Sequence, residues 1–166
     1  MSDPSSAAVS ETDLAHLRRC VQLAEDALDA GDEPFGSVLV AGDGTVLAED
    51  RNRVAATGDR TRHPEFALAR WAAENLPVAD RGRATVYTSG EHCPMCSAAH
   101  AWVGLRRIVY AVSSAQLGEW LSAWAVPGAP VAPLPVQQVA PGVEVAGPAE
   151  PLTEAMRELH RRHHRR

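Results

Sequence analysis

The sequence contains no long uninterrupted apolar stretch and very few cysteines. No window approaches the ~18 consecutive apolar residues that a membrane-spanning helix requires. The first ten residues hold no basic segment followed by an apolar run, so we expect no secretory leader. The three cysteines are an odd number, and two of them form a C-x-x-C pair, which favours metal or redox chemistry over a framework of disulfides. We therefore expect a cytoplasmic protein with no membrane association.

Lysine is also absent, so all sixteen cationic side chains other than histidine are arginine. The formal net charge is −5, but the last ten residues carry five arginines against one glutamate, which leaves −9 on the rest of the chain. An acidic body of this kind is a poor match to the phosphates of nucleic acid. We therefore expect no nucleic-acid partner. Residues 160–166 are interpreted as a basic, solvated tail and residues 1–11 as a flexible N-terminus.

Helical and extended segments alternate along the middle of the chain. Apolar residues at three- and four-residue steps predict an amphipathic helix over residues 12–30, with "SETD" as a capping box at its start. The segments "SVLVA" and "TVLAED" flank "GDG", which predicts a β-hairpin. Further helices are predicted over 64–75, 94–103 and 114–124, and strands over 84–89 and 107–112. This order predicts an α/β protein folded as a three-layer α/β/α sandwich with a central mixed sheet.

The C-terminal third has a different composition. After Trp124, frequent prolines in "AVPGAPVAPLPVQQVAPGVEVAGPAEP" disfavour regular structure. We therefore expect one domain, residues 12–159. It is divided into a core over 12–125, a proline-rich wrap over 126–150 with one short strand near 136–139, and a terminal helix over 151–159.

Residues with metal-binding side chains stand at the starts of two predicted helices. Cys93 and Cys96 are three residues apart, so both sulfurs lie on one face of a first helical turn, where the positive helix end favours thiolates. His63 lies directly before another predicted helix, with Pro64 at its first position. One imidazole and two thiolates suit Zn²⁺, and three protein ligands leave the fourth tetrahedral position open for water. We therefore predict Zn²⁺ as a cofactor held by His63, Cys93 and Cys96.

Glu65 stands two residues from the predicted histidine ligand and is not needed as a ligand itself. Two thiolates cancel the double charge of the ion, so the metal alone should acidify its water less than an all-histidine site would. A nearby base is then useful. We predict Glu65 as the catalytic residue, which takes a proton from water and returns it to a leaving group.

Two other interpretations of these residues remain open. His100 follows Cys96 by four residues on the same helical face, so it can complete a four-ligand structural zinc site with the three predicted ligands. Glu65 would then have no chemical role. The C-x-x-C pair alone can also form a redox pair, although no thioredoxin-like context precedes it.

The spacing of these residues resembles the cytidine deaminase-like superfamily of zinc deaminases, in which H-x-E is followed at a distance by P-C-x-x-C. "EPFGSVLV" is similar to the first strand of that family, "RNRV" to its asparagine-containing strand end, and "YTSGEHCPMCSAAHAW" to the cysteine-bearing helix of guanine deaminase-like members. The resemblance covers roughly Leu14 to Val112. It implies a cytidine deaminase-like fold in which Glu65 shuttles protons as ammonia leaves a nucleobase, and in which Asn52 holds the base or its sugar.

Two positions depart from the pattern of that family. His92 stands where the family has proline before the first cysteine, and its side chain can face the pocket. Pro64 stands where many members have alanine, whose backbone N–H donates a hydrogen bond to the bound base. Proline has no N–H to donate. Asn52, His92 and Pro64 are therefore our candidate substrate-binding residues.

The residues and the resemblance together predict a zinc-dependent hydrolytic deaminase of a small nucleobase or nucleoside, with guanine-type substrates first. A cytosine- or cytidine-type deaminase is the first alternative. A tRNA adenosine deaminase, favoured only by the arginine-rich tail, and a non-catalytic zinc-stabilised interaction module are the others. Four tryptophans on predicted helices suit core or subunit packing, and we expect a homodimer.

Overall fold

The computed structural model of the chain describes residues 7–165 and folds them around a five-stranded mixed sheet with the strand order β2-β1-β3-β4-β5. β1 runs antiparallel to both β2 and β3, whereas β3, β4 and β5 run parallel to one another. The strands are β1 (Gly36–Val40), β2 (Val46–Arg51), β3 (Thr85–Gly90), β4 (Arg107–Val112) and β5 (Glu144–Ala146).

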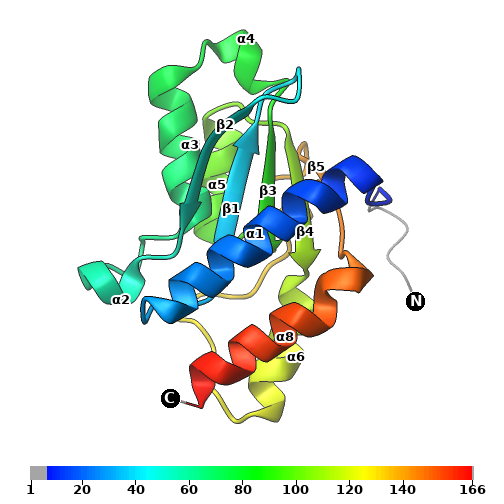
Figure 1. Cartoon of the computed structure of the whole chain (residues 1–166). Coiled ribbons are helices and arrows are strands. Elements are labelled where there is room, and N and C mark those ends of the chain that lie inside the picture. Colours follow the sequence, from blue (N-terminus) through cyan, green and yellow to red (C-terminus); the bar gives the residue numbers. More distant parts are fainter. Residues whose placement is uncertain (1–6, 166) are drawn as a thin grey trace.

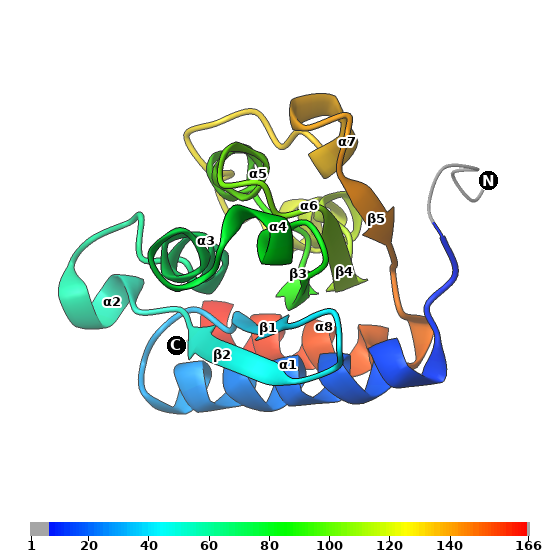
Figure 2. The ribbon, with the colours of Figure 1, turned by 90° about the horizontal axis from the view of Figure 1, so that it is seen from above.

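Helices cover both faces of this sheet. α1 and α8 lie side by side on one face (Figure 1), and α3 and α5 lie on the other, as the view from above shows (Figure 2). The predicted three-layer α/β/α sandwich is therefore confirmed. The helices are α1 (Glu11–Asp29), α2 (Val54–Thr57), α3 (Pro64–Asn75), α4 (Val78–Arg81), α5 (Pro94–Trp102), α6 (Ser114–Ala123), α7 (Val136–Val139) and α8 (Glu150–His164).

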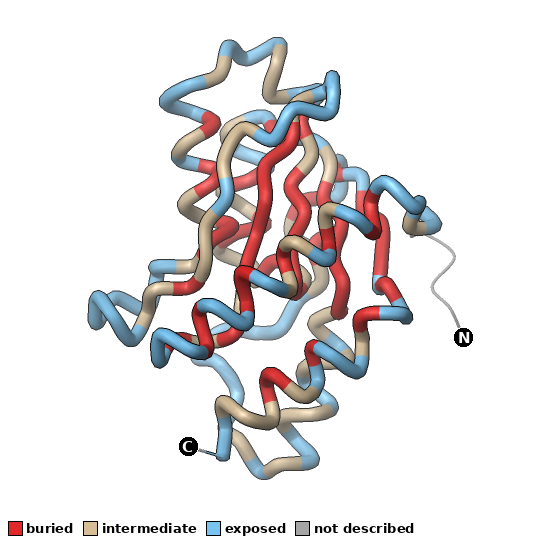
Figure 3. Tube along the Cα trace, viewed as in Figure 1, coloured by how far each residue is buried: buried red, intermediate tan, exposed pale blue. Residues whose placement is uncertain are grey.

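The central strands are buried on both of their faces. β1 is buried along its whole length, and only the first residues of β3 and β4 are partly exposed (Figure 3). α1 places Leu17 and Leu28 in an apolar cluster on one side of the sheet, and α3 places Leu68 and Ala72 in a second cluster on the other. The sheet thus fixes the helices on both sides, and with them the polar residues at the ends of its strands. Within the described part of the chain, no helix combines the length and apolarity needed to cross a membrane.

A charged network holds the start of α1 against the sheet. The Ser10 hydroxyl accepts a hydrogen bond from the Asp13 N–H, and the Asp13 carboxylate accepts one from the Ser10 N–H. That carboxylate also accepts two hydrogen bonds from Arg107, at 3.0 and 3.1 Å, and one from the Tyr87 hydroxyl at 2.9 Å. Burial acts to raise the pKa of Asp13, but the hydrogen bonds from Arg107, Ser10 and Tyr87 outweigh it and lower this pKa to about 2.

We expect Asp13→Asn to lower the free energy of unfolding by about 2–3 kcal/mol, because it leaves a partly buried arginine without its anionic partner. The wild-type carboxylate contributes stability above its ordinary pKa of 3.8, and this contribution is lost as the pH falls towards the folded-state pKa of about 2. Urea unfolding of both proteins at neutral pH and at a series of acidic pH values measures the difference. A difference that stays constant with pH would contradict this account.

The proline-rich segment contains a helical turn where a strand was expected. The predicted strand near 136–139 is wrong, because these residues form α7. Pro135 immediately precedes this turn, and the Val136 N–H donates a hydrogen bond to the Glu91 carboxylate at 3.0 Å. The strand of this segment is β5, which pairs with the edge of β4 instead. Pairing with a strand distant in sequence, and not the local residue pattern, places it there.

Both ends of the described chain are held in place more firmly than expected. α8 continues to His164, whereas residues 160–166 were interpreted as a solvated tail. That interpretation is wrong for residues 160–163, which are buried or partly buried, while His164 and Arg165 are exposed. His160 is buried, and Arg162 lies 3.9 Å from Glu25 and 3.7 Å from Asp29 of α1. At the other end, the Ala7 N–H donates a hydrogen bond to the Val145 carbonyl. Of the predicted N-terminal segment 1–11, residue 7 therefore pairs with β5 and Ser10 caps α1, while 1–6 lie outside the described residues.

Candidate metal centre

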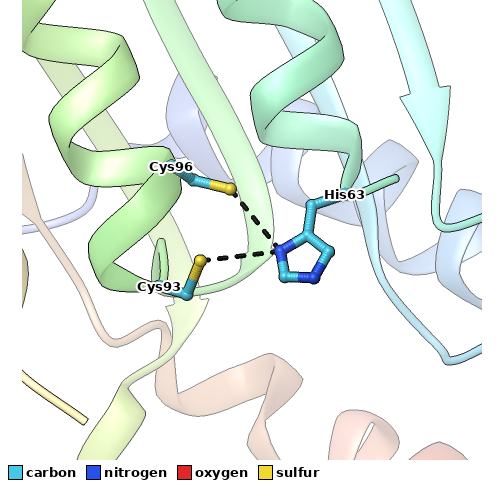
Figure 4. Close-up of side chains that lie close together, drawn as sticks. All are labelled: His63, Cys93 and Cys96. Atoms are coloured by element: carbon cyan, nitrogen blue, oxygen red, sulfur yellow. Dashed lines mark hydrogen bonds between the residues drawn. The ribbon is translucent and has the colours of Figure 1, made fainter. Parts of the chain in front are cut away.

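Two helix N-termini meet at one edge of the sheet. His63 is the N-cap residue of α3 and Cys93 is the N-cap residue of α5, and both have extended backbone conformations. Neither side chain caps its own helix, and the two point towards each other instead (Figure 4). Pro64 and Pro94 occupy the first helical positions, where a fixed φ suits the helix and an N–H has no intrahelical partner. The local sequence therefore directs both ligand-type side chains out of their helix ends.

The predicted metal ligands converge. The ligand atoms of His63, Cys93 and Cys96 all lie within 4.8 Å of one another. Nδ1 of His63 lies 3.5 Å from Sγ of Cys93 and 3.6 Å from Sγ of Cys96 (Figure 4). Zinc bonds of ~2.0–2.1 Å to nitrogen and ~2.3 Å to sulfur, at tetrahedral angles, place nitrogen and sulfur about 3.6 Å apart. The donor set and its spacing therefore fit a zinc ion with three protein ligands.

The pKa values of the three ligand-type side chains are shifted in different directions. The hydrogen bond from Cys96 and the contact with His63 lower the pKa of Cys93 to about 4, although burial opposes this shift. Hydrogen bonding to Cys93 raises the pKa of His63 to about 9. The neighbouring Cys93 and burial raise the pKa of Cys96. Zinc binds thiolates and a neutral imidazole, so it competes with these protons, and its affinity for the site should fall as the pH decreases.

Glu65 lies beside this cluster in the first turn of α3 and is almost completely buried. Its Oε1 accepts a hydrogen bond from the Thr88 hydroxyl at 2.9 Å, and its Oε2 lies 4.0 Å from Sγ of Cys96. Burial raises the pKa of Glu65 to about 7, against the opposing effects of His63 and of hydrogen bonds. A carboxyl group that titrates near neutral pH can both accept and donate a proton. Its environment therefore suits the predicted role.

The structure separates His100 from the cluster. Among the described residues, the group able to hold a metal comprises the three predicted ligands and does not include His100. The His100 ring packs edge to face against His92, with centroids 5.4 Å apart and planes at 86°. Both rings are completely buried, and their nitrogens have no hydrogen-bond partner in the described chain. The four-ligand structural zinc site therefore does not form, and the burial of His92 argues against direct contact with a substrate.

We expect His100→Leu to raise the midpoint of thermal unfolding by a few degrees. A buried polar group without a hydrogen bond costs ~1–3 kcal/mol, and leucine fills a similar volume without that cost. Calorimetry together with metal analysis measures the change, and the zinc content should stay the same because His100 is not a ligand. A marked loss of stability would show that the imidazole nitrogens do make a stabilising interaction.

Asn52 follows the last residue of β2 and is buried. Its Oδ1 accepts a hydrogen bond from the Val54 N–H at 3.0 Å, and its backbone N–H donates to the Phe35 carbonyl. The side-chain oxygen therefore caps the turn into α2. The amide nitrogen makes no hydrogen bond to the described residues, so its two N–H donors are available to a ligand.

Two polar residues near the cluster were not predicted from the sequence. The Thr88 hydroxyl donates a hydrogen bond to Glu65, and the polar pair Thr88 and Ser89 at the end of the predicted strand "ATVYTS" was a signal that could have indicated it. Glu91 accepts hydrogen bonds from the backbone N–H groups of Ser114 at 2.8 Å and Val136 at 3.0 Å, which tie α6 and α7 to the loop that carries Cys93. Nothing near Glu91 in the sequence indicates these distant partners.

The chain is similar in sequence and in fold to proteins that are already known. The family model of the cytidine and deoxycytidylate deaminase zinc-binding region matches residues 10–112. The chain is 37% identical over 113 residues to a probable cytosine deaminase of Schizosaccharomyces pombe, covering 68% of each chain. It is 36% identical over 104 residues to guanine deaminase of Bacillus subtilis, covering 62% of this chain and 66% of that protein. The solved guanine deaminase from Nitrosomonas europaea shares the fold, with a TM-score of 0.68 and 19% identity over 96% of this chain and 89% of that one.

Proposed function

The chain belongs to the family of the cytidine and deoxycytidylate deaminase zinc-binding region, and we propose that it removes the amino group of a small guanine-type base by hydrolysis. Zinc is its cofactor, and the reaction is hydrolysis of a C–N bond in a nucleobase or nucleoside. The observation that carries the proposal is the triangle of His63, Cys93 and Cys96 with a carboxylate oxygen of Glu65 beside it.

The residues of the site divide the work of this reaction. Zinc held by the three ligands supplies Lewis acidity, which makes water a stronger nucleophile at neutral pH. Oε2 of Glu65 accepts a proton from the attacking water and then donates it to the amino group of the base. The nitrogen leaves as ammonia. The second proton of the water ends on the ring nitrogen next to the reacting carbon, as the water oxygen becomes the carbonyl oxygen of the product. Because Oε1 is bonded to Thr88, Oε2 is the oxygen assigned to this proton transfer.

Asn52 and Pro64 are proposed to set the recognition of the base. The amide N–H groups of Asn52 can donate to a carbonyl oxygen or a ring nitrogen of the base, since only the side-chain oxygen is engaged by the turn. Pro64 cannot donate from its backbone, so an acceptor on the base must be met by another group. An acceptor left unpaired costs roughly 1–3 kcal/mol, which is enough to change the preference among bases by about tenfold or more.

A panel of substrates tests the proposed specificity. Zinc-loaded protein is incubated with guanine, guanosine, cytosine, cytidine, a deoxycytidylate and tRNA, and the release of ammonia is measured. We expect guanine to be turned over with the highest kcat/KM. The curated relatives named cytosine deaminase and guanine deaminase are almost equally similar to this chain, so cytosine is the main competitor. Preference for tRNA would support the nucleic-acid alternative, and no release from any substrate would support a non-catalytic module.

We also propose that the chain forms a homodimer through the outer face of α5. This helix contains no charged residue, and Trp102 near its end is 89% exposed. Trp102 lines a groove with apolar residues of α5 and of the α7 region, among them Ala98, Val139 and Val143, and with Arg106. An exposed tryptophan beside a groove lined mainly by small and apolar residues is typical of an interface between subunits.

Light scattering after gel filtration tests the dimer. We expect the wild type to be dimeric and Trp102→Asp to be monomeric, because the charge cannot be buried in an apolar contact. Val78 of α4 offers a matched control, since it is 71% exposed and does not line this groove, so Val78→Asp should remain dimeric. A monomeric wild type would refute the homodimer.

A further inference from the structure

A pair of buried hydroxyl groups lies behind Glu65. Ser37 of β1 and Thr88 of β3 are direct cross-strand partners. The Ser37 hydroxyl donates a hydrogen bond to Oγ1 of Thr88 at 2.9 Å, and the Thr88 hydroxyl donates to Oε1 of Glu65 at 2.9 Å. Both hydroxyl-bearing residues are completely buried, and Glu65 is 5% exposed. The three side chains therefore form one hydrogen-bonded row that runs from the sheet to the candidate metal centre.

The position of Thr88 is determined from both sides. A hydroxyl has one proton and two lone pairs. The Thr88 oxygen accepts from Ser37, and its single proton has two acceptors within reach, Oε1 of Glu65 at 2.9 Å and the Gly90 carbonyl at 3.0 Å. A carboxylate is the stronger acceptor of the two. When Oε2 carries a proton, Oε1 is the carbonyl oxygen of the carboxylic acid and can still accept from the Thr88 hydroxyl. The same hydroxyl can thus hold Oε1 in both states of the proposed proton transfer.

The consequence for Glu65 is a division between its two oxygens. Oε1 is held by Thr88, and Oε2 faces Cys96. Without the hydroxyl, the carboxylate would have no side-chain donor for Oε1 among its hydrogen bonds in the described chain, and it could rotate about its last torsion. The pairing of β1 with β3 does not need the hydroxyl, since backbone groups supply it. A purely structural role at position 88 would be filled equally well by valine.

We propose that Thr88 is a positioning residue for Glu65, and that Ser37 orients the Thr88 hydroxyl for this task. The inference rests on the proposed function, because it assigns Thr88 and Ser37 to the proton transfer performed by Glu65. Glu65 remains the group that exchanges protons with water and substrate. The cross-strand register of two residues 51 positions apart in the sequence brings the hydroxyls to this point.

Conservative substitutions of Thr88 test the proposal in the zinc-loaded, full-length protein. Thr88→Val removes the hydroxyl and keeps the shape, and we expect kcat to fall about 10- to 100-fold, as is typical for residues that orient catalytic groups. KM and zinc content should change little. Thr88→Ser keeps a hydroxyl and should restore most of kcat. Turnover is measured with guanine or cytosine, whichever the wild type deaminates faster.

Variants of Ser37, the hydrogen-bond partner of Thr88, and of a matched control residue distinguish a positioning role from an effect on general stability. Ser37→Ala should lower kcat less than Thr88→Val does, and it should add little in the Thr88→Val background, because both act on the same hydroxyl. Ser89→Ala removes another buried hydroxyl of the same strand. The Ser89 hydroxyl accepts a hydrogen bond from the Gly36 N–H and makes none to Glu65. Its kcat should remain close to that of the wild type. Equal losses of kcat in Ser89→Ala and Thr88→Val would overturn the proposal.

A crystal structure of zinc-loaded Thr88→Val gives a readout that does not depend on turnover. We expect the Glu65 carboxylate to occupy a different rotamer or more than one. A carboxylate that keeps its wild-type position, or a variant with wild-type kcat, would refute the role of Thr88 while leaving the proposed function intact. The proposed function itself fails separately, if the wild-type protein releases no ammonia from any base or nucleoside.

Discussion

Glu65→Gln should retain zinc and the native fold but lose turnover by about 10²–10⁴-fold, the usual contribution of general acid–base catalysis. The amide has the size of the carboxyl group and can still accept a hydrogen bond from Thr88 through its oxygen. It cannot take a proton from water or return one to the departing amino group. Because Glu65 lies next to the cluster without belonging to it, zinc binding should be unaffected. Metal analysis, circular dichroism and the ammonia assay measure the three properties.

The control for this experiment is an acidic residue with a comparable setting and no contact with the cluster. Asp32 is 2% exposed and accepts a hydrogen bond from the Ala56 N–H at 2.8 Å. Asp32→Asn should affect stability more than kcat. Full activity in zinc-loaded Glu65→Gln would exclude Glu65 as the proton shuttle, whatever the substrate.

Cys96→Ser should remove the zinc, and with it the activity. We expect about one zinc per chain in the wild type and almost none in the variant, because a serine hydroxyl stays protonated where a thiolate is required. A ligand that binds only the native state stabilises it, so the variant should also unfold at a lower temperature. The wild type stripped with a chelator should show the same loss of stability and regain its activity when zinc is added back.

The third cysteine supplies the matched control for this prediction. Cys20 is completely buried in α1 and lies in the apolar cluster on the face of the sheet that α1 and α8 cover. Cys20→Ala should cost stability through the lost packing but retain the zinc and the activity of the remaining native protein. If Cys96→Ser still bound one zinc per chain, the assignment of the ligands would be wrong.

Those parts of the site that depend on local chain geometry could be predicted from the sequence. A C-x-x-C pair at a helix start, and a histidine directly before a proline that begins a helix, direct their side chains out of the helix ends regardless of what lies opposite. The alternation of helix and strand patterns also determined the layers of the fold. Each helix and strand must bury its apolar face against another element, and this leaves few ways to arrange such elements.

Which of the remaining polar residues lie at the site depends on tertiary contacts. His100 shares a helical face with Cys96, but it lies four residues, or ~6 Å, further along the helix axis. Its ring therefore packs against His92 and does not reach the cluster at the N-terminus of α5. Ser37 and Thr88 meet because of the register between β1 and β3. Three further elements are placed by distant partners: α7 contacts Glu91, β5 pairs with β4, and the last turn of α8 contacts α1. Contacts between residues distant in sequence depend on the packing of whole elements, which no local pattern of residues encodes.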